Sequence, residues 1–124
     1  MVTLPGGSEH QTQSAFVEWC VTQERRYPIL QMAFAIPNGG ARHVTVAAKL
    51  KAEGVKPGVP DWHLPVPMGK YAGLWIEFKY GDNKVTKSQD SYIWALRAQG
   101  HRVEVCYTVD SAISVTESYL NQKE

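Results

Sequence analysis

Residues 73–80, GLWIEFKY, have the alternating pattern of side chains that is typical of a β-strand. Successive side chains of a strand point to opposite faces of its sheet. One face of this strand is therefore apolar and carries Leu74, Ile76, Phe78 and Tyr80. Glu77 and Lys79 share the other face with Trp75, so the two charges point the same way.

The rest of the pattern predicts four helices and three further strands. We expect the helices at residues 8–26, 44–53, 86–99 and 110–120. We expect the other strands at residues 30–36, 61–64 and 102–107. The order α-β-α-β-β-α-β-α predicts an α/β (α+β) fold with a mixed β-sheet flanked by helices. The length of 124 residues suits a single domain, residues 8–124, after a flexible N-terminal arm, residues 1–7.

Capping signals mark where several of these helices begin. Ser8 with Gln11, and Thr86 with Gln89, match the capping box, in which two side chains satisfy the first backbone N–H groups of a helix. Asp110 is expected to cap the last helix.

Polar side chains from separate elements are expected to meet Glu77. The two central strands are joined by a short connection, and such neighbours usually pair antiparallel, which puts Asp61 beside Glu77. Gln89 lies on the apolar stripe of its helix and points inward. Glu9 lies on the apolar stripe of the first helix, whereas Glu18 lies on the opposite side and remains the rival candidate for an acid near the site.

The charges are unevenly spread along the chain, although the net charge of +1 gives no signal of a polyanion partner. Lys and Arg outnumber Asp and Glu between residues 42 and 87, and both flanks are net acidic. A basic middle that holds a few inward acids suits the docking of a polyanion together with a cation. Ordinary solvated lysines would give the same count, so that alternative stays open. The candidate DNA contacts among them are Lys49, Lys56 and Lys87.

The sequence disfavours several other classes of protein. It has no apolar run of about 18 residues, and its start, MVTLPGGSEHQ, lacks the basic and apolar regions of a signal peptide, so we expect a cytoplasmic location. Cys20 and Cys106 have apolar neighbours and are expected to be buried, reduced thiols. The histidines show no ligand spacing, and no phosphate-binding loop of the type G-x-x-x-x-G-K-[ST] occurs, so neither a histidine metal site nor ATP is implied.

The expected pair of carboxylates restricts the chemistry. Two carboxylates about 4 Å apart repel by about 4 kcal/mol at an effective dielectric constant of 20, so the pair shares a proton, takes a salt-bridge partner or binds a divalent cation. An ion pair of Glu77 with Lys79 is the structural alternative, and it leaves Asp61 and Gln89 without a role. Asp61, Glu77 and the backbone carbonyl of Phe78 offer the hard oxygen ligands that suit Mg²⁺ or Mn²⁺. Lys79 is then placed to act on a water or to offset charge on a phosphate.

The chain resembles the PD-(D/E)xK nuclease superfamily, and in particular its VRR-NUC branch. Four segments carry the resemblance: IPNGGARH at 36–43, LKAEGVKPGVPDWHLPVP at 50–67, GLWIEFKYG at 73–81 and TKSQDSYIWALRAQGHRVEVC at 86–106. It spans nearly the whole chain and is strongest to the small stand-alone members from phages and bacteria. The resemblance implies a restriction-endonuclease-like sheet flanked by helices.

The resemblance also implies a role for each candidate residue. Asp61 and Glu77 would be metal ligands, Lys79 the catalytic lysine and Gln89 a supporting residue. Glu9 would be the acid of the first helix and is the candidate for a further metal ligand. The turn that follows residue 37 would approach the DNA backbone, where glycines allow close contact and a guanidinium grips a phosphate. The residues of that turn are Asn38, Gly39, Gly40, Arg42 and His43.

The function that the resemblance implies is that of an Mg²⁺- or Mn²⁺-dependent endodeoxyribonuclease that hydrolyses phosphodiester bonds. Members of this size look like homodimers that cut branched DNA such as four-way (Holliday) junctions, and a two-fold dimer places two sites on opposing strands. The alternative is a non-catalytic DNA-binding or assembly subunit derived from a nuclease fold. The presence of Asp61, Glu77 and Lys79 argues against that alternative, because a binding module has no need of acids beside phosphate.

Overall fold

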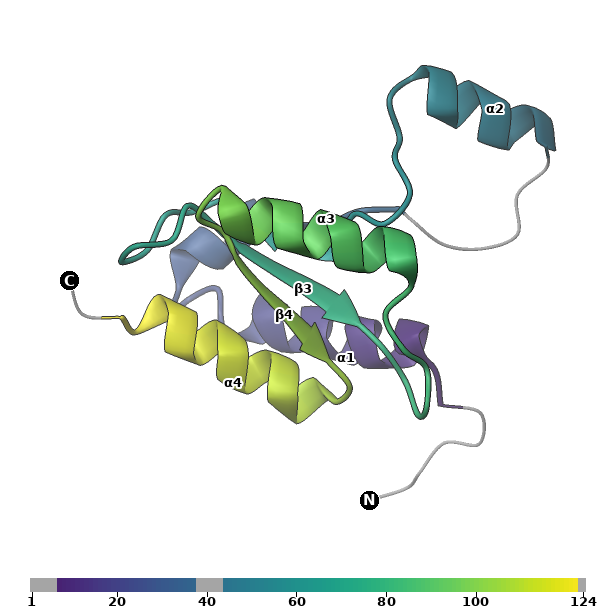
Figure 1. Ribbon diagram of the computed structural model, residues 1–124. Coiled ribbons are helices and arrows are strands. Elements are labelled where there is room, and N and C mark those ends of the chain that lie inside the picture. The colour runs from purple at the N-terminus through teal and green to yellow at the C-terminus, as the bar shows by residue number, and fades with distance from the viewer. Residues whose placement is uncertain (1–6, 38–43, 123–124) are drawn as a thin grey trace.

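The computed structural model describes residues 7–37 and 44–122 (Figure 1). Within these residues, four strands form one mixed sheet in the order β1-β2-β3-β4. They are β1 (Phe34–Ala35), β2 (Trp62–Leu64), β3 (Leu74–Phe78) and β4 (Arg102–Cys106). β2 pairs antiparallel with β1 and with β3, and β4 pairs parallel with β3. The expected mixed sheet is therefore confirmed.

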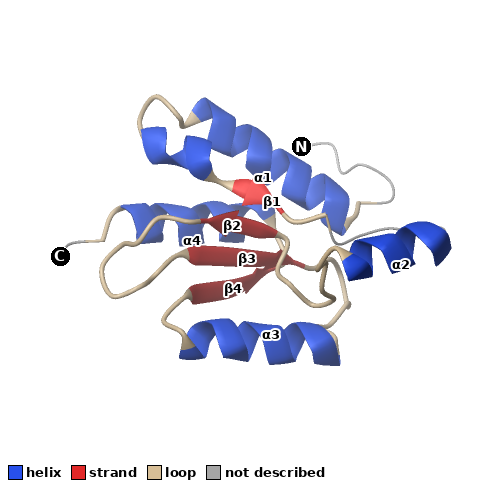
Figure 2. Ribbon diagram, turned by 90° about the horizontal axis from the view of Figure 1, so that it is seen from above, coloured by secondary structure: helices blue, strands red, loops and turns tan. Residues whose placement is uncertain are grey.

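The helices flank this sheet, as Figure 2 shows. They are α1 (Glu9–Thr22), α2 (Val44–Ala52), α3 (Lys87–Ala98) and α4 (Val109–Leu120), with a short 3-10 helix, η1 (Pro28–Met32), after α1. α1 and α4 pack against each other and against β3, and α3 packs against β4. Apart from η1, the order of elements is the one that the sequence predicts. None of the helices in the described ranges is long and apolar enough to cross a membrane.

The apolar face of β3 forms the centre of the core. Ile76 and Phe78 are fully buried. The ring of Phe16 in α1 meets the ring of Trp62 edge to face, with 4.9 Å between the centroids, and lies 5.6 Å from the ring of Phe78. Because alternate side chains of β3 are fixed against the helices in this way, Glu77 is turned to the opposite face of the sheet.

The expected buried strand at residues 30–36 is wrong. The first part of that segment belongs to η1, and only Phe34–Ala35 is a strand, with both of its side chains exposed. The cause is Pro28, whose fixed φ and missing N–H suit the first turn of a helix. Leu30 is the buried residue of this turn. α1 also ends at Thr22 rather than near residue 26, because the chain turns there toward η1.

Side chains cap the helices largely as expected. The Ser8 hydroxyl accepts a hydrogen bond from the Gln11 N–H at 3.1 Å. The full capping box of Thr86 and Gln89 at the start of α3 is confirmed. The expected cap of the last helix by Asp110 is wrong, because Thr108 is the residue whose side chain accepts from the backbone of α4. Asp110 lies in the first turn instead, where its charge favours the positive end of the helix.

α2 stands away from the rest of the molecule (Figure 1). None of its side chains is buried, and Val44 is 81% exposed. The sequence predicts this helix, but not that all of its side chains stay outside the core.

The loop between α2 and β2 lies directly against the first turn of α3. Gly58 in this loop has a φ of +88°, and a Cβ built on it would lie 2.5 Å from the backbone oxygen of Ser88. Only glycine permits both this backbone conformation and this close approach. Because the loop continues into Asp61, the contact fixes Asp61 relative to α3 and its Gln89.

Gly58→Ala is expected to lower the free energy of unfolding by at least about 1 kcal/mol more than Gly100→Ala does, because a side chain at position 58 must push the loop away from α3. Gly100 is the matched control: its φ is +89°, and a Cβ there meets nothing within 4 Å. Chemical denaturation of both variants measures the difference. If both variants lose the same free energy of unfolding, the contact of the loop with α3 does not contribute to stability.

Candidate active site

The start of β2 brings the Asp61 carboxylate to β3. Its Oδ2 atom accepts a hydrogen bond from the Phe78 N–H at 2.8 Å, so the carboxylate reaches across from one strand to the next. The backbone oxygen of Asp61 accepts from the Ile36 N–H, also at 2.8 Å, which ties it to the end of β1. The N–H and C=O of one strand residue point to the same edge, so the Phe78 carbonyl also lies on the Asp61 side of β3.

The Glu77 carboxylate is buried, with 1% of the residue exposed, and its two oxygens differ. Oε2 accepts a hydrogen bond from Gln89 Nε2 at 3.1 Å. Oε2 also lies 3.6 Å from the Lys79 Nζ atom. Oε1 is buried and has no hydrogen-bond partner. Because a buried polar atom normally has a partner, Oε1 is the atom of the site at which we expect a ligand to bind.

Lys79 follows directly after β3 and is buried as well, with 5% of the residue exposed. Its backbone N–H donates to the Cys106 carbonyl at 3.0 Å, which extends the pairing of β3 with β4 by one residue. The ammonium group is therefore held on the same side of the sheet as Glu77, as the alternation in the sequence predicts.

The pKa of Glu77 is raised to about 8. Burial is the main cause, because it penalises the charged carboxylate, and the negative charge of Asp61 comes next. Asp61 also favours the protonated form of Glu77 as a hydrogen-bond partner, and the charge of Glu9 adds more weakly. Lys79 lowers the pKa but does not offset the other effects. Lys79 thus does not balance the negative charge of Asp61, Glu77 and Glu9.

A divalent cation would fit this deficit. Among residues 7–37 and 44–122, no three His, Cys, Asp or Glu side chains come close enough together to form a metal site on their own. The donors that we expect a cation to use remain the Asp61 and Glu77 carboxylates and the Phe78 carbonyl. Such a sparse set of oxygens suits Mg²⁺, which keeps several waters when it binds to proteins, and Mn²⁺ accepts the same ligands.

The raised pKa predicts how the stability of the metal-free protein depends on pH. Between the ordinary pKa of 4.5 and about 8, the folded protein keeps a proton on Glu77 that the unfolded chain has released. This contribution to stability is therefore complete below pH 4.5 and is lost as the pH rises toward 8. The melting temperature in EDTA should fall across this window, and Glu77→Gln should remove much of the fall.

Glu18→Gln is the control for this experiment, because Glu18 is exposed on α1. Melting curves at several values of pH from 5 to about 8.5 compare the three proteins. If wild type and Glu77→Gln lose stability in parallel, Glu77 does not titrate in this range and the assignment of its pKa is wrong.

Glu9 lines a cavity of about 630 Å³ together with Asp61. Its Oε2 atom accepts a hydrogen bond from Asn83 Nδ2 at 3.1 Å. Glu18 is exposed, so the structure puts the expected acid of the first helix, and not its rival, beside the site. Asn83 was not among the residues expected from the sequence, because nothing in the polar turn that holds it distinguishes it from a surface residue.

Gln89 connects α3 to the site through both ends of its amide. Its Oε1 atom accepts from the Thr86 N–H at 2.9 Å, which closes the capping box, and its Nε2 atom donates to Glu77. The inward direction that the helical pattern predicts for Gln89 agrees with this contact.

The expected DNA-binding residues fall into two groups. Lys49 in α2, Lys56 in the following loop and Lys87 at the start of α3 are all exposed. The others, Asn38, Gly39, Gly40, Arg42 and His43, lie outside the described residues. Pro37, which precedes them, lines the cavity of Asp61 and a second cavity beside α2.

The fold and the site together define a nuclease domain of the PD-(D/E)xK type: an Asp at the start of one strand lies beside a Glu of the next, and a Lys follows two residues later. The chain belongs to the VRR-NUC domain family, which matches residues 7–110. A solved structure described as "VRR_NUC domain protein" has 30% sequence identity and a TM-score of 0.79, and the match covers 94% of this chain and 90% of that chain. A comparison with curated proteins found no match. Membership of the family assigns the chain to nuclease-type domains that act on DNA.

Proposed function

We propose that this protein is an Mg²⁺- or Mn²⁺-dependent endonuclease that hydrolyses phosphodiester bonds of DNA. The observation that carries the proposal is the Glu77 Oε1 atom, which is buried without a hydrogen-bond partner in a site where Asp61 adds further negative charge. A buried acceptor atom that is left without a donor costs free energy, even when the other oxygen of the same carboxylate has partners. A cation-binding role gives this arrangement a purpose that an ion pair with Lys79 alone does not.

Each side chain would have a separate task in hydrolysis. Asp61, Glu77 and the Phe78 carbonyl would hold the cation. When bound, the cation supplies a Lewis acid that makes a water more acidic and offsets phosphate charge. Lys79 would donate a hydrogen bond from its ammonium to a phosphate oxygen or to the attacking water. Gln89 would keep the Glu77 carboxylate in one orientation, which matters because misplaced ligands lower metal affinity and rate.

We further propose that the substrate is branched DNA, such as a four-way junction, and that the active form is a homodimer. A two-fold dimer presents the same site twice and can cut two opposing strands. The exposed lysines at positions 49, 56 and 87 provide phosphate contacts on the α2 and α3 side of the site. The likeness to small stand-alone VRR-NUC proteins is the support for this substrate.

A panel of DNA substrates tests these proposals. Linear, flapped, forked and four-way DNA of matched sequence are incubated with Mg²⁺, Mn²⁺ or EDTA, and the products are separated on denaturing gels. We expect cleavage with either metal, none in EDTA, and the fastest cleavage on four-way DNA. Sedimentation of the free protein should give the mass of two chains.

The same panel decides between the two classes of function. Binding of DNA without cleavage in either metal would indicate the non-catalytic DNA-binding or assembly subunit. Equal cleavage of every DNA shape would support the proposed nuclease activity and show that the proposed selectivity for branched DNA is wrong.

A further inference from the structure

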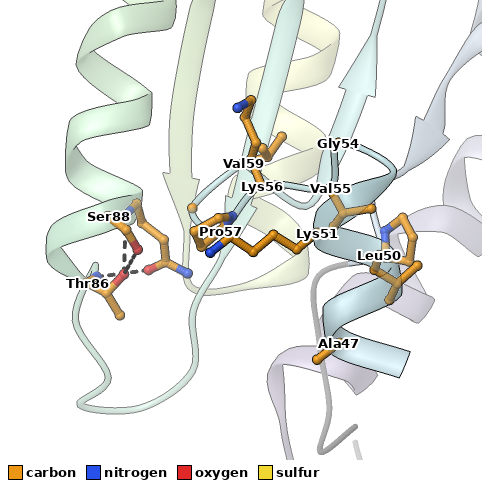
Figure 3. Close-up of a pocket in the computed structure, with 13 residues that line it drawn as sticks. Ala47, Leu50, Lys51, Gly54, Val55, Lys56, Pro57, Val59, Thr86 and Ser88 are labelled. Atoms are coloured by element: carbon orange, nitrogen blue, oxygen red, sulfur yellow. Dashed lines mark hydrogen bonds between the residues drawn. The ribbon is translucent and has the colours of Figure 1, made fainter. Parts of the chain in front are cut away.

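A cavity of about 740 Å³ lies between α2 and the first turn of α3 (Figure 3). Gln89 lines one end of this cavity, and the same side chain donates a hydrogen bond to Glu77. The cavity therefore lies next to the candidate active site, on the side toward α2. Its volume falls within the range of about 300–1,000 Å³ that is common for sites that bind small molecules.

Part of the cavity lining is apolar, and its side chains are together called the apolar wall. Leu50 of α2 and Val55, Pro57 and Val59 of the following loop form it. None of these side chains is aromatic, and no Asp or Glu is among the described residues that line the cavity. This wall offers a surface for the flat, apolar face of a ligand rather than for a charged group.

The other feature of the cavity is its positive charge. Lys51 and Lys56 both line it, and Figure 3 shows Lys51 extending from α2 across the cavity toward Pro57. On the α3 side, Ser88 contributes a hydroxyl group. A ligand that fits must therefore combine an apolar face with negative charge and groups that form hydrogen bonds, and a nucleotide has all three.

We propose that this cavity holds one unpaired nucleotide of the strand that is cut, next to the scissile phosphate. The base would lie against the apolar wall, and Lys51 and Lys56 would contact its flanking phosphates. A base must leave its partner and its stack to enter such a cavity, and this costs less at a branch point, where base pairs open more easily, than inside a continuous duplex. The inference rests on the proposed nuclease function and adds to it a source of selectivity that the catalytic residues themselves lack.

Abasic sites test whether a base enters the cavity. A set of fluorescent four-way junctions carries one abasic site each, at successive nucleotides around the branch, and anisotropy in EDTA measures binding without cleavage. For wild-type protein we expect one position where loss of the base weakens binding about tenfold, as when roughly 60 Å² of apolar contact is lost.

Ala47→Trp fills the cavity from α2, where Ala47 is exposed. This variant should bind the intact junction about tenfold more weakly and show no further loss at the sensitive abasic position. Ala98→Trp is the matched control, because Ala98 is exposed at the far end of α3, and it should behave as wild type. If wild type has no sensitive position, or if Ala47→Trp keeps the full abasic effect, the proposal is wrong.

The two lysines are tested by the salt dependence of binding. Lys51→Ala and Lys56→Ala should each reduce the slope of log affinity against log salt by about 1, because each removes one phosphate contact. Lys70→Ala, in the turn between β2 and β3, should leave the slope unchanged. Unchanged slopes in the first two variants would overturn this part of the proposal.

Two outcomes separate this proposal from its alternatives. If Ala47→Trp changes the sedimenting mass of the DNA-free protein, a second copy of the chain covers the cavity and the nucleotide assignment fails. If the abasic effect is present but no DNA is cleaved in Mg²⁺ or Mn²⁺, the result supports nucleotide binding in the cavity. The proposed nuclease activity would then be wrong.

Discussion

Glu77→Ala is expected to lower the rate of DNA cleavage by at least about a thousandfold, while DNA binding changes little. The variant removes the buried oxygen that lacks a partner and one of the carboxylates that would hold the cation. Cleavage rates under single-turnover conditions in Mn²⁺, with anisotropy for DNA affinity, measure both parts of the prediction.

The fold of this variant can be judged independently of its activity. Because burial and the nearby acids raise the pKa of Glu77 to about 8, the metal-free alanine variant should lose less stability than wild type as the pH rises. Glu18→Ala, in the exposed part of α1, serves as the control and should cleave normally. If the Glu77→Ala protein is folded and cleaves DNA at the wild-type rate, the assignment of Glu77 to the active site is wrong.

Lys79→Ala is expected to lower the cleavage rate by about a hundredfold or more, with a much smaller effect on Mn²⁺ affinity. The ammonium lies 3.6 Å from Glu77 Oε2, close enough to act in the same site, but it cannot itself be a ligand of a cation. Titration of Mn²⁺ by calorimetry and the cleavage rate at saturating Mn²⁺ separate the two effects.

The pH of this experiment matters, because burial raises the pKa of Glu77 and Lys79 partly offsets that rise. Without Lys79, a proton competes more strongly with the metal, so the affinities should be compared at about pH 9, above the pKa of about 8 in the wild type. Lys84→Ala is the control, since Lys84 is exposed. If Lys79→Ala loses Mn²⁺ affinity at that pH but keeps its rate at saturation, the lysine supports the metal site and is not catalytic.

The sequence predicts best the strands and helices that have one face in the apolar core and the other face in a polar environment. β3 is the best example, because Phe78 enters the core while Glu77 faces the site. The segment 30–36 has apolar residues without such alternation, and apolar content alone does not distinguish a strand from a turn of 3-10 helix. The conformational restriction of Pro28 decides between them.

The candidate site is predicted from two local signals. The short connection between β2 and β3 brings Asp61 to Glu77, and the capping box fixes Gln89 at the start of α3. The sequence does not reveal that Glu77 has one satisfied and one unsatisfied oxygen, because this depends on the distances to Gln89 and Lys79 in the folded chain. It also gives no sign of the cavity beside α2, since the loop of Gly58 has no periodic pattern.

The amide of Gln89 has a consequence for engineering this protein. Its oxygen caps α3 and its nitrogen donates to Glu77, so one side chain serves both helix and carboxylate. Glutamate also closes a capping box, but it would place a further negative charge next to Glu77 and supply no donor. Selection for thermal tolerance and selection for turnover would therefore both retain glutamine at position 89, because glutamate would leave the buried Glu77 carboxylate without its donor.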